Sequence, residues 1–527
     1  MKKHRPAPAP EQAPAPPPLS AGLRRYLYLT ACVTGAAIMI VEILGAKMLS
    51  PYIGTSHFVW TAQIAVTLVA LACGYYAGGR LVDRSSRLGR LYWAILIAAA
   101  YLALTVAVRE WVAYAFLRLP LAVGSLLTSL FLFFLPLCLL AMTGPFLVRV
   151  STGSLSSVGG TVGRLNAIST IGSFLGTVLI SYLLIPLLPN SITMYATAAL
   201  LMALAVVYLA LWGRKIRTVA GAAAVVVAGL AAGAWGLRAE GLRSPVFDEL
   251  SRVNSSFGLL QVLQLKGQPE RYFLSDYLTQ NTYDSLQGKS TSMFTYMLEG
   301  LARAYTPRLE KALCIGMGIG IVPRQLARDG VRVDVVEINP AVVGLAQKYF
   351  DLDPGEFELS IGDGRWFVNQ SRKRYDAVIL DAFLGDSTPS HLMSREAFTA
   401  IRNVLEPDGV LVINTFVDFG ARRDFFGASL SRTLASVFAS VRVHGARGAN
   451  TLFVASPRQD LSILHEPDFG RVHPAALRDV REAFSSTWEP DPLAGILLTD
   501  DYNPTDYYDA ANREKLRRAL ALSMRSP

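Results

Sequence analysis

The hydrophobic pattern divides the chain into two halves. Up to about residue 237, long apolar runs alternate with short polar segments, and each run approaches the roughly 20 residues that a helix needs to cross a bilayer. Residues 1–25 are largely Pro and Ala with basic residues at the start, and such a segment cannot bury a core, so we expect a disordered tail. Residues 26–237 then form a transmembrane domain with about seven spans, placed at 26–49, 58–81, 91–109, 121–148, 160–185, 190–212 and 218–237.

The second half has the pattern of a soluble domain. Short strands separated by turn residues predict a small β region over 245–290. From 291 to 527, short apolar strands alternate with helical segments, and the clearest strands lie at 311–315, 331–337, 375–381 and 409–415. This alternation is typical of a parallel sheet covered by helices. We therefore expect a multi-pass α-helical membrane domain followed by an α/β Rossmann-like domain.

The composition supports this division. Of the 527 residues, 52% are hydrophobic and only 17% are charged, against about 25% charged in a typical soluble protein. The net charge of +10 does not indicate nucleic-acid binding, because many basic residues occupy loops between apolar runs and no basic stripe with interleaved aromatics is present. The four cysteines lack the spacing of a disulfide framework or a zinc site, so we expect no metal.

The loops between the spans predict the orientation in the membrane. Lys and Arg gather before the first span and in the loops after the second, fourth and sixth, whereas the loops PYIGTSH and PLLPN carry none. Positive loops stay in the cytoplasm, which predicts a protein of the cell (inner) membrane with a cytoplasmic N-terminus. Seven spans would place the C-terminal domain on the other side, away from a cytosolic cofactor. If one span is miscounted, the C-terminal domain would lie in the cytoplasm. The side of the membrane on which this domain lies therefore stays open.

Residues that can hold a nucleoside follow the first strands of the α/β domain. Ligands of parallel sheets bind beyond the carboxyl ends of the strands. The first strand is followed by a glycine loop that lets the backbone approach a ligand at the start of a helix, with glycines at Gly316, Gly318 and Gly320. Glu337 ends the second strand about 20 residues later, where a carboxylate can accept hydrogen bonds from ribose hydroxyls.

Two further acids follow the next strands. Asp363, with Gly364 after it, can bind an adenine amino group, and Asp381 ends the strand VILD beside the same crevice. Each feature alone has a structural alternative: a tight turn for the glycines, a helix-capping acid for Glu337 and Asp381, and an Asx turn for Asp363. In this order, at successive strand ends, they indicate a nucleoside-sulfonium site of the class I methyltransferase type.

These residues resemble the spermidine synthase (polyamine aminopropyltransferase) family. The similar segments are ALCIGMGIG, VVEINP, GDGRWF and YDAVILDAFLGDSTPSHLMSREAF, and the likeness covers about 245–460. The segments EILGAKMLSPYIGTSHFVWT and GYYAGGRLVDR add a likeness to its membrane-fused branch, the fused facilitator/spermidine synthase proteins. The resemblance implies transfer of an aminopropyl group from decarboxylated S-adenosylmethionine to a polyamine such as putrescine, without a metal.

The resemblance also implies roles for individual residues. Glu337 would hold the ribose, Asp363 and Gly364 the adenine end, and Asp381 would be the catalytic acid–base residue. Tyr296 matches the family's tyrosine at the amine pocket. The second Asp of the family's Asp-x-x-Asp element falls at Leu384, and Asp386 lies two residues on as a substrate-binding candidate.

Other departures from the family pattern leave alternatives open. Ile319 stands where the family loop has the Asp that binds the aminopropyl ammonium, and Met297 stands where a Gln usually follows the pocket tyrosine. The transferred group could then be a methyl from ordinary S-adenosylmethionine to a membrane-associated substrate. A transporter or binding protein with a non-catalytic domain is a further alternative, favoured by Glu42 and Lys47 in the first span. The expected partners are an amine and the lipid bilayer, and the acceptor and a homo-oligomeric state stay open.

Overall fold

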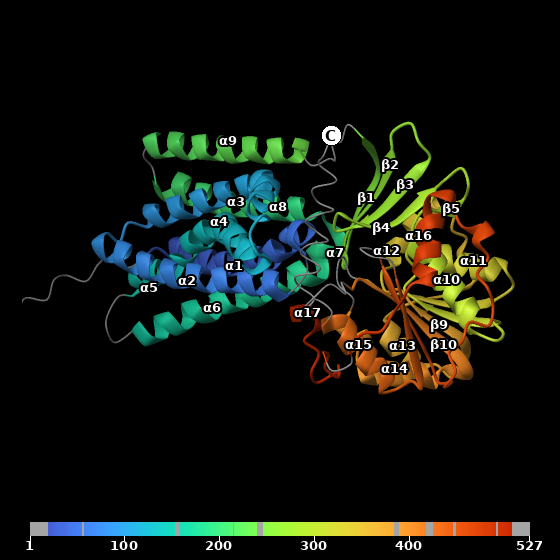
Figure 1. Ribbon diagram of the computed structural model, residues 1–527. Coiled ribbons are helices and arrows are strands. Elements are labelled where there is room, and N and C mark those ends of the chain that lie inside the picture. The colour runs from blue at the N-terminus through green and yellow to red at the C-terminus, as the bar shows by residue number, and fades with distance from the viewer. Residues whose placement is uncertain are drawn as a thin grey trace, which may run out of the picture.

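The computed structural model describes residues 19–54, 57–152, 158–213, 216–239, 246–383, 389–417, 425–445, 450–491 and 494–508. Figure 1 shows two bodies side by side: an N-terminal helical bundle and a C-terminal α/β domain, which is extended by a small twisted sheet. The fold class expected from the sequence is confirmed.

The bundle contains seven helical segments, within the described residues, that are long and apolar enough to cross a membrane. Its helices are α1 (Ala21–Ile53), α2 (His57–Arg84), α3 (Leu88–Phe116), α4 (Leu121–Ala141), α5 (Thr143–Ser151), α6 (Val158–Leu179), α7 (Ile185–Leu187), α8 (Asn190–Tyr208) and α9 (Ile216–Ala239). The first helix begins at Ala21, inside the segment 1–25 that the sequence assigned to the tail. Residues 1–18 lie outside the described residues.

Two of the expected spans are interrupted rather than continuous. The fourth is divided at Met142 into α4 and α5. Pro145 follows closely and lacks the N–H that would bond back to the carbonyl one turn earlier, which accounts for the break. The fifth runs from α6 through a π-helical turn, Ile180–Leu184, into α7.

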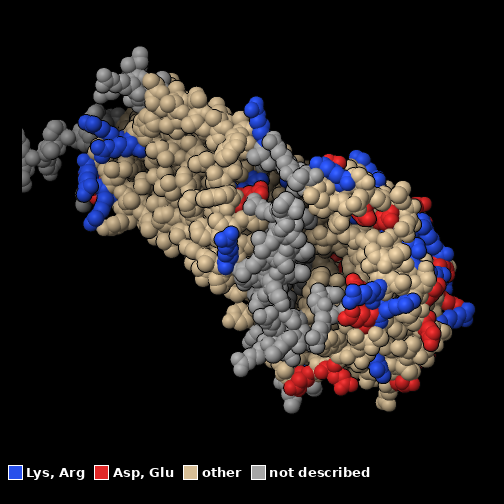
Figure 2. Space-filling model, turned by 45° about the horizontal axis from the view of Figure 1, so that its top comes forward, with Lys and Arg blue, Asp and Glu red and all other residues tan. Residues whose placement is uncertain are grey.

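Small residues allow α1 to approach α6 closely. A Cβ atom built on Gly172 would lie 2.1 Å from the Cys32 carbonyl oxygen, and one on Gly176 would lie 2.6 Å from that of Ala36. Helices in membranes associate largely through such backbone proximity, because lipid tails remove the hydrophobic driving force between them. The outer faces of α6 and α9 are apolar and exposed. Figure 2 shows that the face of the bundle in view carries few charged side chains between its two ends.

The small β region forms a five-stranded antiparallel sheet in the order of the chain. Its strands are β1 (Phe247–Ser255), β2 (Gly258–Leu265), β3 (Glu270–Ser275), β4 (Leu278–Asp284) and β5 (Lys289–Ser290). Two of its turns touch the end of α1: Lys47 Nζ donates to the Ser256 carbonyl oxygen at 3.2 Å, and the rings of Tyr52 and Tyr277 lie 5.7 Å apart. The bundle therefore meets the C-terminal half partly through this sheet, and the His57 ring at the start of α2 also stacks 6.4 Å from the Tyr507 ring.

The α/β domain is built on an eight-stranded sheet. In chain order its strands are β6 (Lys311–Ile315), β7 (Arg332–Glu337), β8 (Glu358–Ile361), β9 (Tyr375–Leu380), β10 (Leu405–Thr415), β11 (Ser440–Gly445), β12 (Thr451–Ser456) and β13 (Thr487–Trp488). Their spatial order is β13-β11-β12-β10-β9-β6-β7-β8, parallel from β10 to β8 and antiparallel at β12, β11 and β13. The chain reverses its direction of strand addition at β6, where a ligand crevice is expected.

Helices cover both faces of this sheet. Along each central strand, alternate residues pack into two separate apolar clusters. One cluster holds α10 (Met293–Tyr305), α11 (Ile321–Arg328), α12 (Pro340–Tyr349) and α16 (Pro474–Ser485), and the other holds α13 (Gly364–Gln370), α14 (Arg395–Asn403) and α15 (Phe425–Ala435). Because both faces are buried, the strands are continuously apolar, and polar residues appear where the strands end.

Candidate active site

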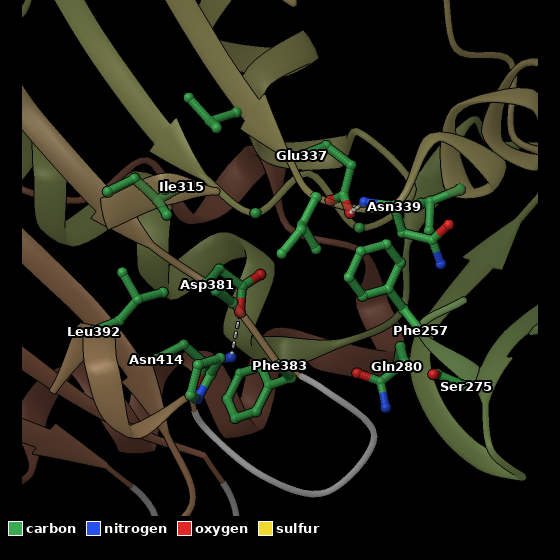
Figure 3. A pocket seen from close by; sticks show the side chains of 18 of the residues that line it. Phe257, Ser275, Gln280, Ile315, Glu337, Asn339, Asp381, Phe383, Leu392 and Asn414 are labelled. Carbon is green, nitrogen blue, oxygen red and sulfur yellow. Dashed lines mark hydrogen bonds between the residues drawn. The ribbon is translucent and has the colours of Figure 1, made fainter. Parts of the chain in front are cut away.

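One cavity lies along the carboxyl ends of the five parallel strands. It is lined by one informative residue from each strand end, which in sheet order from β8 to β10 are Asp363, Glu337, Gly316, Asp381 and Asn414. Figure 3 shows Glu337 and Asp381 facing this cavity, with Phe257, Ser275 and Gln280 of the small sheet on the opposite wall. The acids and glycines expected at separate strand ends thus come together.

The glycine loop passes very close to the end of β9. Gly316, Gly318 and Gly320 have φ angles of 91°, 53° and 81°, which disfavour any residue with a side chain. A Cβ atom on Gly316 would lie 2.1 Å from the Asp381 carbonyl oxygen. Gly316 and Gly318 line the cavity, whereas Gly320 packs against Leu352 and serves the turn.

Glu337 is buried at the end of β7 and is held by the backbone. Its two carboxylate oxygens accept hydrogen bonds from the N–H groups of Met317 at 3.0 Å and Asn339 at 2.8 Å. Burial raises the pKa of Glu337, although these N–H groups oppose the shift. A carboxylate offers about four lone-pair sites, so the fixed side chain retains acceptor capacity for ligand hydroxyls.

Asp363 caps α13 and pairs with a histidine. Its Oδ1 accepts from the Trp366 N–H at 2.9 Å, and its Oδ2 lies 2.9 Å from His391 Nε2. Partial burial works against ionisation, but the hydrogen bonds from Trp366 and His391 hold the pKa of Asp363 below its ordinary value. Next to it, a Cβ atom on Gly364 would lie 2.4 Å from the Ile315 side chain, so glycine is needed here for packing.

Asp381 is the most perturbed acid of the cavity. Burial raises its pKa to about 6, the hydrogen bond from Asn414 opposes this, and the nearby charge of Glu337 adds to it. Asn414 Nδ2 donates to Asp381 Oδ1 at 2.8 Å, and Asn450 Nδ2 donates to Asn414 Oδ1 at 2.8 Å. A carboxylate with a pKa close to neutrality, in a cleft and with one oxygen fixed, is suited to exchanging protons with a ligand.

Sequence reasoning missed two groups in this site. Asn414 is the next-to-last residue of β10 and Asn450 directly precedes β12, and a search for polar residues close to strand ends would have found the first. His391 is half exposed and lines the cavity, where it pairs with Asp363.

Some expected site residues lie elsewhere. The Tyr296 hydroxyl donates to the Ser290 carbonyl oxygen at 2.6 Å, and its side chain lines a second cavity with Glu299 and Arg303 instead of the one that contains Asp381. Its role at the amine pocket stays a prediction. Asp386 and Leu384 lie outside the described residues.

An acidic segment near the C-terminus, residues 498–504, is bonded to the residues at the rim of the cavity. Arg365 Nη2 donates to Asp500 Oδ2 at 2.9 Å, and Asn503 Nδ2 donates to the Ser390 carbonyl oxygen at 2.9 Å. Asp500 is therefore already paired with an arginine, and the segment holds the 390–394 stretch, which borders the cavity, in place.

Comparison with known proteins agrees with this geometry. Residues 292–442 match the family model of the spermine/spermidine synthase domain. A probable polyamine aminopropyl transferase of Bifidobacterium longum is 28% identical over 283 residues, which cover 49% of this chain and 63% of that protein. An N-terminal histidine N-methyltransferase of Emericella nidulans is 37% identical over 138 residues, which cover 25% of this chain and 24% of that protein. The chain thus spans less than two thirds of these curated relatives.

Among solved structures, a match is found to the spermidine synthase from Thermotoga maritima, with a TM-score of 0.36 and 21% sequence identity over 45% of this chain and 84% of that chain.

Proposed function

We propose that the protein is a membrane-anchored transferase that moves an aminopropyl group from decarboxylated S-adenosylmethionine to an amine, because residues 292–442 match the model of the spermine/spermidine synthase domain. The family's acceptor, a polyamine such as putrescine, is the reference acceptor for an assay. The single observation that carries the proposal is the position of Asp381, an acid with a pKa of about 6, beside Glu337 and the glycine loop in one cavity.

The residues of the cavity fit a nucleoside donor. Glu337 would accept hydrogen bonds from the ribose hydroxyls, while Asp363 and Gly364 would border the adenine. Gly316 and Gly318 leave room for the donor against the backbone, which a Cβ atom would fill. These assignments follow the order of the strands, with the adenine at β8, the ribose at β7 and the reacting end at β9.

Asp381 would act on the acceptor. An aliphatic amine has a pKa near 10.4 and is protonated at pH 7, so it must lose a proton before its nitrogen can attack. Asp381 would accept or relay that proton and align the nitrogen with the carbon next to the sulfonium. The new N–C bond forms as the C–S bond breaks, and the electron pair of the broken bond stays on sulfur, so the reaction needs no covalent enzyme intermediate.

Methyl transfer from ordinary S-adenosylmethionine is the second candidate. Ile319 is buried in the core, with 1% of its surface exposed, so it offers no carboxylate to an aminopropyl ammonium. The same strand-end acids would bind the nucleoside of either donor, and the matching histidine N-methyltransferase supports this candidate.

The seven apolar helices support anchoring in the cell membrane, with the basic N-terminal end in the cytoplasm. A protein anchored in this way should remain with the membrane fraction after a high-salt or alkaline wash.

Calorimetry of the full-length protein with each donor tests the proposal. We expect the decarboxylated donor to bind more tightly. Preference for ordinary S-adenosylmethionine would support methyl transfer instead, and binding of neither would remove both candidates.

The role of Asp381 is tested by Asp381→Asn. Loss of a proton acceptor typically lowers the rate 10²–10⁴-fold, so we expect turnover to fall by about two orders of magnitude or more while donor binding persists. Asp408→Asn, at an exposed position in the first half of β10, is the matched control. Turnover that survives in Asp381→Asn would refute the assignment.

A further inference from the structure

The wall of the cavity that faces the strand ends is supplied by the small sheet. Phe257, in the β1–β2 turn, and Ser275, at the end of β3, both line the cavity. Because β1 is an edge strand of this sheet, the turn that carries Phe257 has a neighbour within the sheet on one side only. The tips of hairpins are among the least constrained parts of a fold. The position of Phe257 therefore depends on contacts from outside the sheet.

One such contact comes from the α/β domain. Asn339 Nδ2 donates to Ser255 Oγ at 3.0 Å, and the same oxygen accepts from the Phe257 N–H at 3.2 Å. The backbone N–H of Asn339 also donates to Glu337 Oε1 at 2.8 Å. Asn339 thus joins the turn to the acid expected to bind the ribose, and Figure 3 shows Phe257 and Asn339 at the same end of the cavity as Glu337.

The other contact comes from the membrane bundle. Lys47 Nζ, near the end of α1, donates to the Ser256 carbonyl oxygen at 3.2 Å. The carboxylate of Asp276, in the adjoining β3–β4 turn, attracts the same ammonium. A hydrogen bond with a charged donor is stronger than one between neutral groups. In the same region the rings of Tyr52 and Tyr277 lie 5.7 Å apart, so α1 holds both turns at this end of the sheet.

We propose that Lys47 is a positioning residue for donor binding: by fixing the β1–β2 turn, it holds the Phe257 ring against the nucleoside of the donor, over Glu337. This inference rests on the proposed function, and it gives the membrane bundle a part in forming the donor site. No bond forms or breaks at Lys47, so its effect lies in the affinity for the donor and not in the chemical step. Both candidate donors carry the same nucleoside, so the expectation holds for either.

Lys47→Met tests this role, because it keeps an unbranched side chain and removes the charge and the N–H donors. With full-length protein, we expect the KM for the donor to rise about tenfold, the lower end of the range for a hydrogen bond to a charged group. The kcat at saturating donor and the KM for the amine should stay close to those of the unaltered protein. Calorimetry with 5′-methylthioadenosine, the nucleoside thioether that both donors contain, should show the same loss of affinity.

Two variants control for the change of charge. Lys47→Arg keeps a charged donor and should leave the KM for the donor close to its original value. Arg118→Met removes a positive charge from an exposed position at the same end of the bundle and should have no effect on it.

A third variant tests the path through the turn. Ser255→Ala removes the hydrogen bond from Asn339 and should also raise the KM for the donor. Lys47→Met and Ser255→Ala act on one turn, so the double variant should be less impaired than the product of the two separate fold-changes.

The outcomes separate this inference from the proposed function. The positioning role would be overturned, and the proposed transfer left intact, by an unchanged KM for the donor in Lys47→Met or by a lower kcat at unchanged KM. A Lys47→Arg protein as impaired as Lys47→Met, or fold-changes that simply multiply in the double variant, would overturn it as well. Failure of the unaltered protein to bind either donor would refute the proposed function, and the positioning role with it.

Discussion

At the scale of single residues, the proposed role of Asp381 predicts how activity depends on pH. If the ionised form of Asp381 is the proton acceptor, its pKa of about 6 makes kcat/KM fall tenfold per unit as the pH decreases below about 6. Asn414 donates to the ionised form and lowers this pKa. Asn414→Leu should therefore move the acidic limb of the profile to higher pH, by about one unit for a hydrogen bond to a charged group.

The pH profile of kcat/KM measures this shift directly. Asn450→Ala removes only the outer contact to Asn414 and should give a smaller shift in the same direction. An acidic limb that stays in place in Asn414→Leu, or moves to lower pH, would show that Asp381 is not the titrating group.

Residues at strand ends were predictable, and side-chain directions from helices were not. Glu337, Asp363 and Asp381 were found from sequence because parallel strands bring their carboxyl ends to one edge whatever the details of packing. Tyr296 lies near the start of α10, and whether it faces one cavity or the other depends on the rotation of that helix against the sheet. That rotation follows from tertiary packing, which a single sequence does not specify.

At the scale of elements, the β6–α11 loop and the end of β9 form one unit. Gly316→Ala would place a methyl group against the Asp381 carbonyl, at a positive φ angle. Strain and overpacking each cost about 1–3 kcal/mol, so we expect the free energy of unfolding to fall by about 2 kcal/mol or more, together with a loss of donor affinity. Denaturation and calorimetry measure the two effects.

Gly344→Ala is the matched control for this change. Gly344 lies in α12 with open space around it, and alanine in a helix interior is favoured over glycine by about 1 kcal/mol. We expect equal or higher stability and unchanged donor affinity. A Gly316→Ala protein as stable and as active as this control would contradict the close approach of the loop to β9.

The elements themselves were predicted unequally well. The strands β6, β7, β9 and β10 were located from their apolar runs, and the parallel order followed from the helices between them. The insertion of β12 between β10 and β11 was not expected, because antiparallel pairing at a sheet edge depends on contacts far apart in the sequence. The break at Met142 was also missed, since hydropathy does not distinguish a continuous helix from an interrupted one.

At the scale of the whole molecule, basic side chains gather at the end of the bundle farthest from the α/β domain, as Figure 2 shows. They belong to the start of α1, the end of α2, the start of α3, the end of α5 and the start of α6, and are Arg24, Arg25, Arg80, Arg84, Arg87, Arg90, Arg149 and Arg164. Among the described residues of the bundle, fewer lie at the near end, namely Lys47, Arg109, Arg118 and Arg238. The arrangement of helices therefore separates the basic end from the α/β domain by the length of the bundle.

This separation predicts the side of the membrane on which the reaction takes place. If the basic end is cytoplasmic, the seven helices carry the α/β domain to the opposite face, and the donor has to be available on that face. Sealed vesicles with the outer face exposed should then transfer label from added donor without permeabilisation, whereas inverted vesicles should require it. A reporter fused after Pro527 provides an independent measure and should be active outside the cytoplasm. Turnover confined to intact inverted vesicles would place the domain in the cytoplasm and would show that the distribution of Lys and Arg does not determine this orientation.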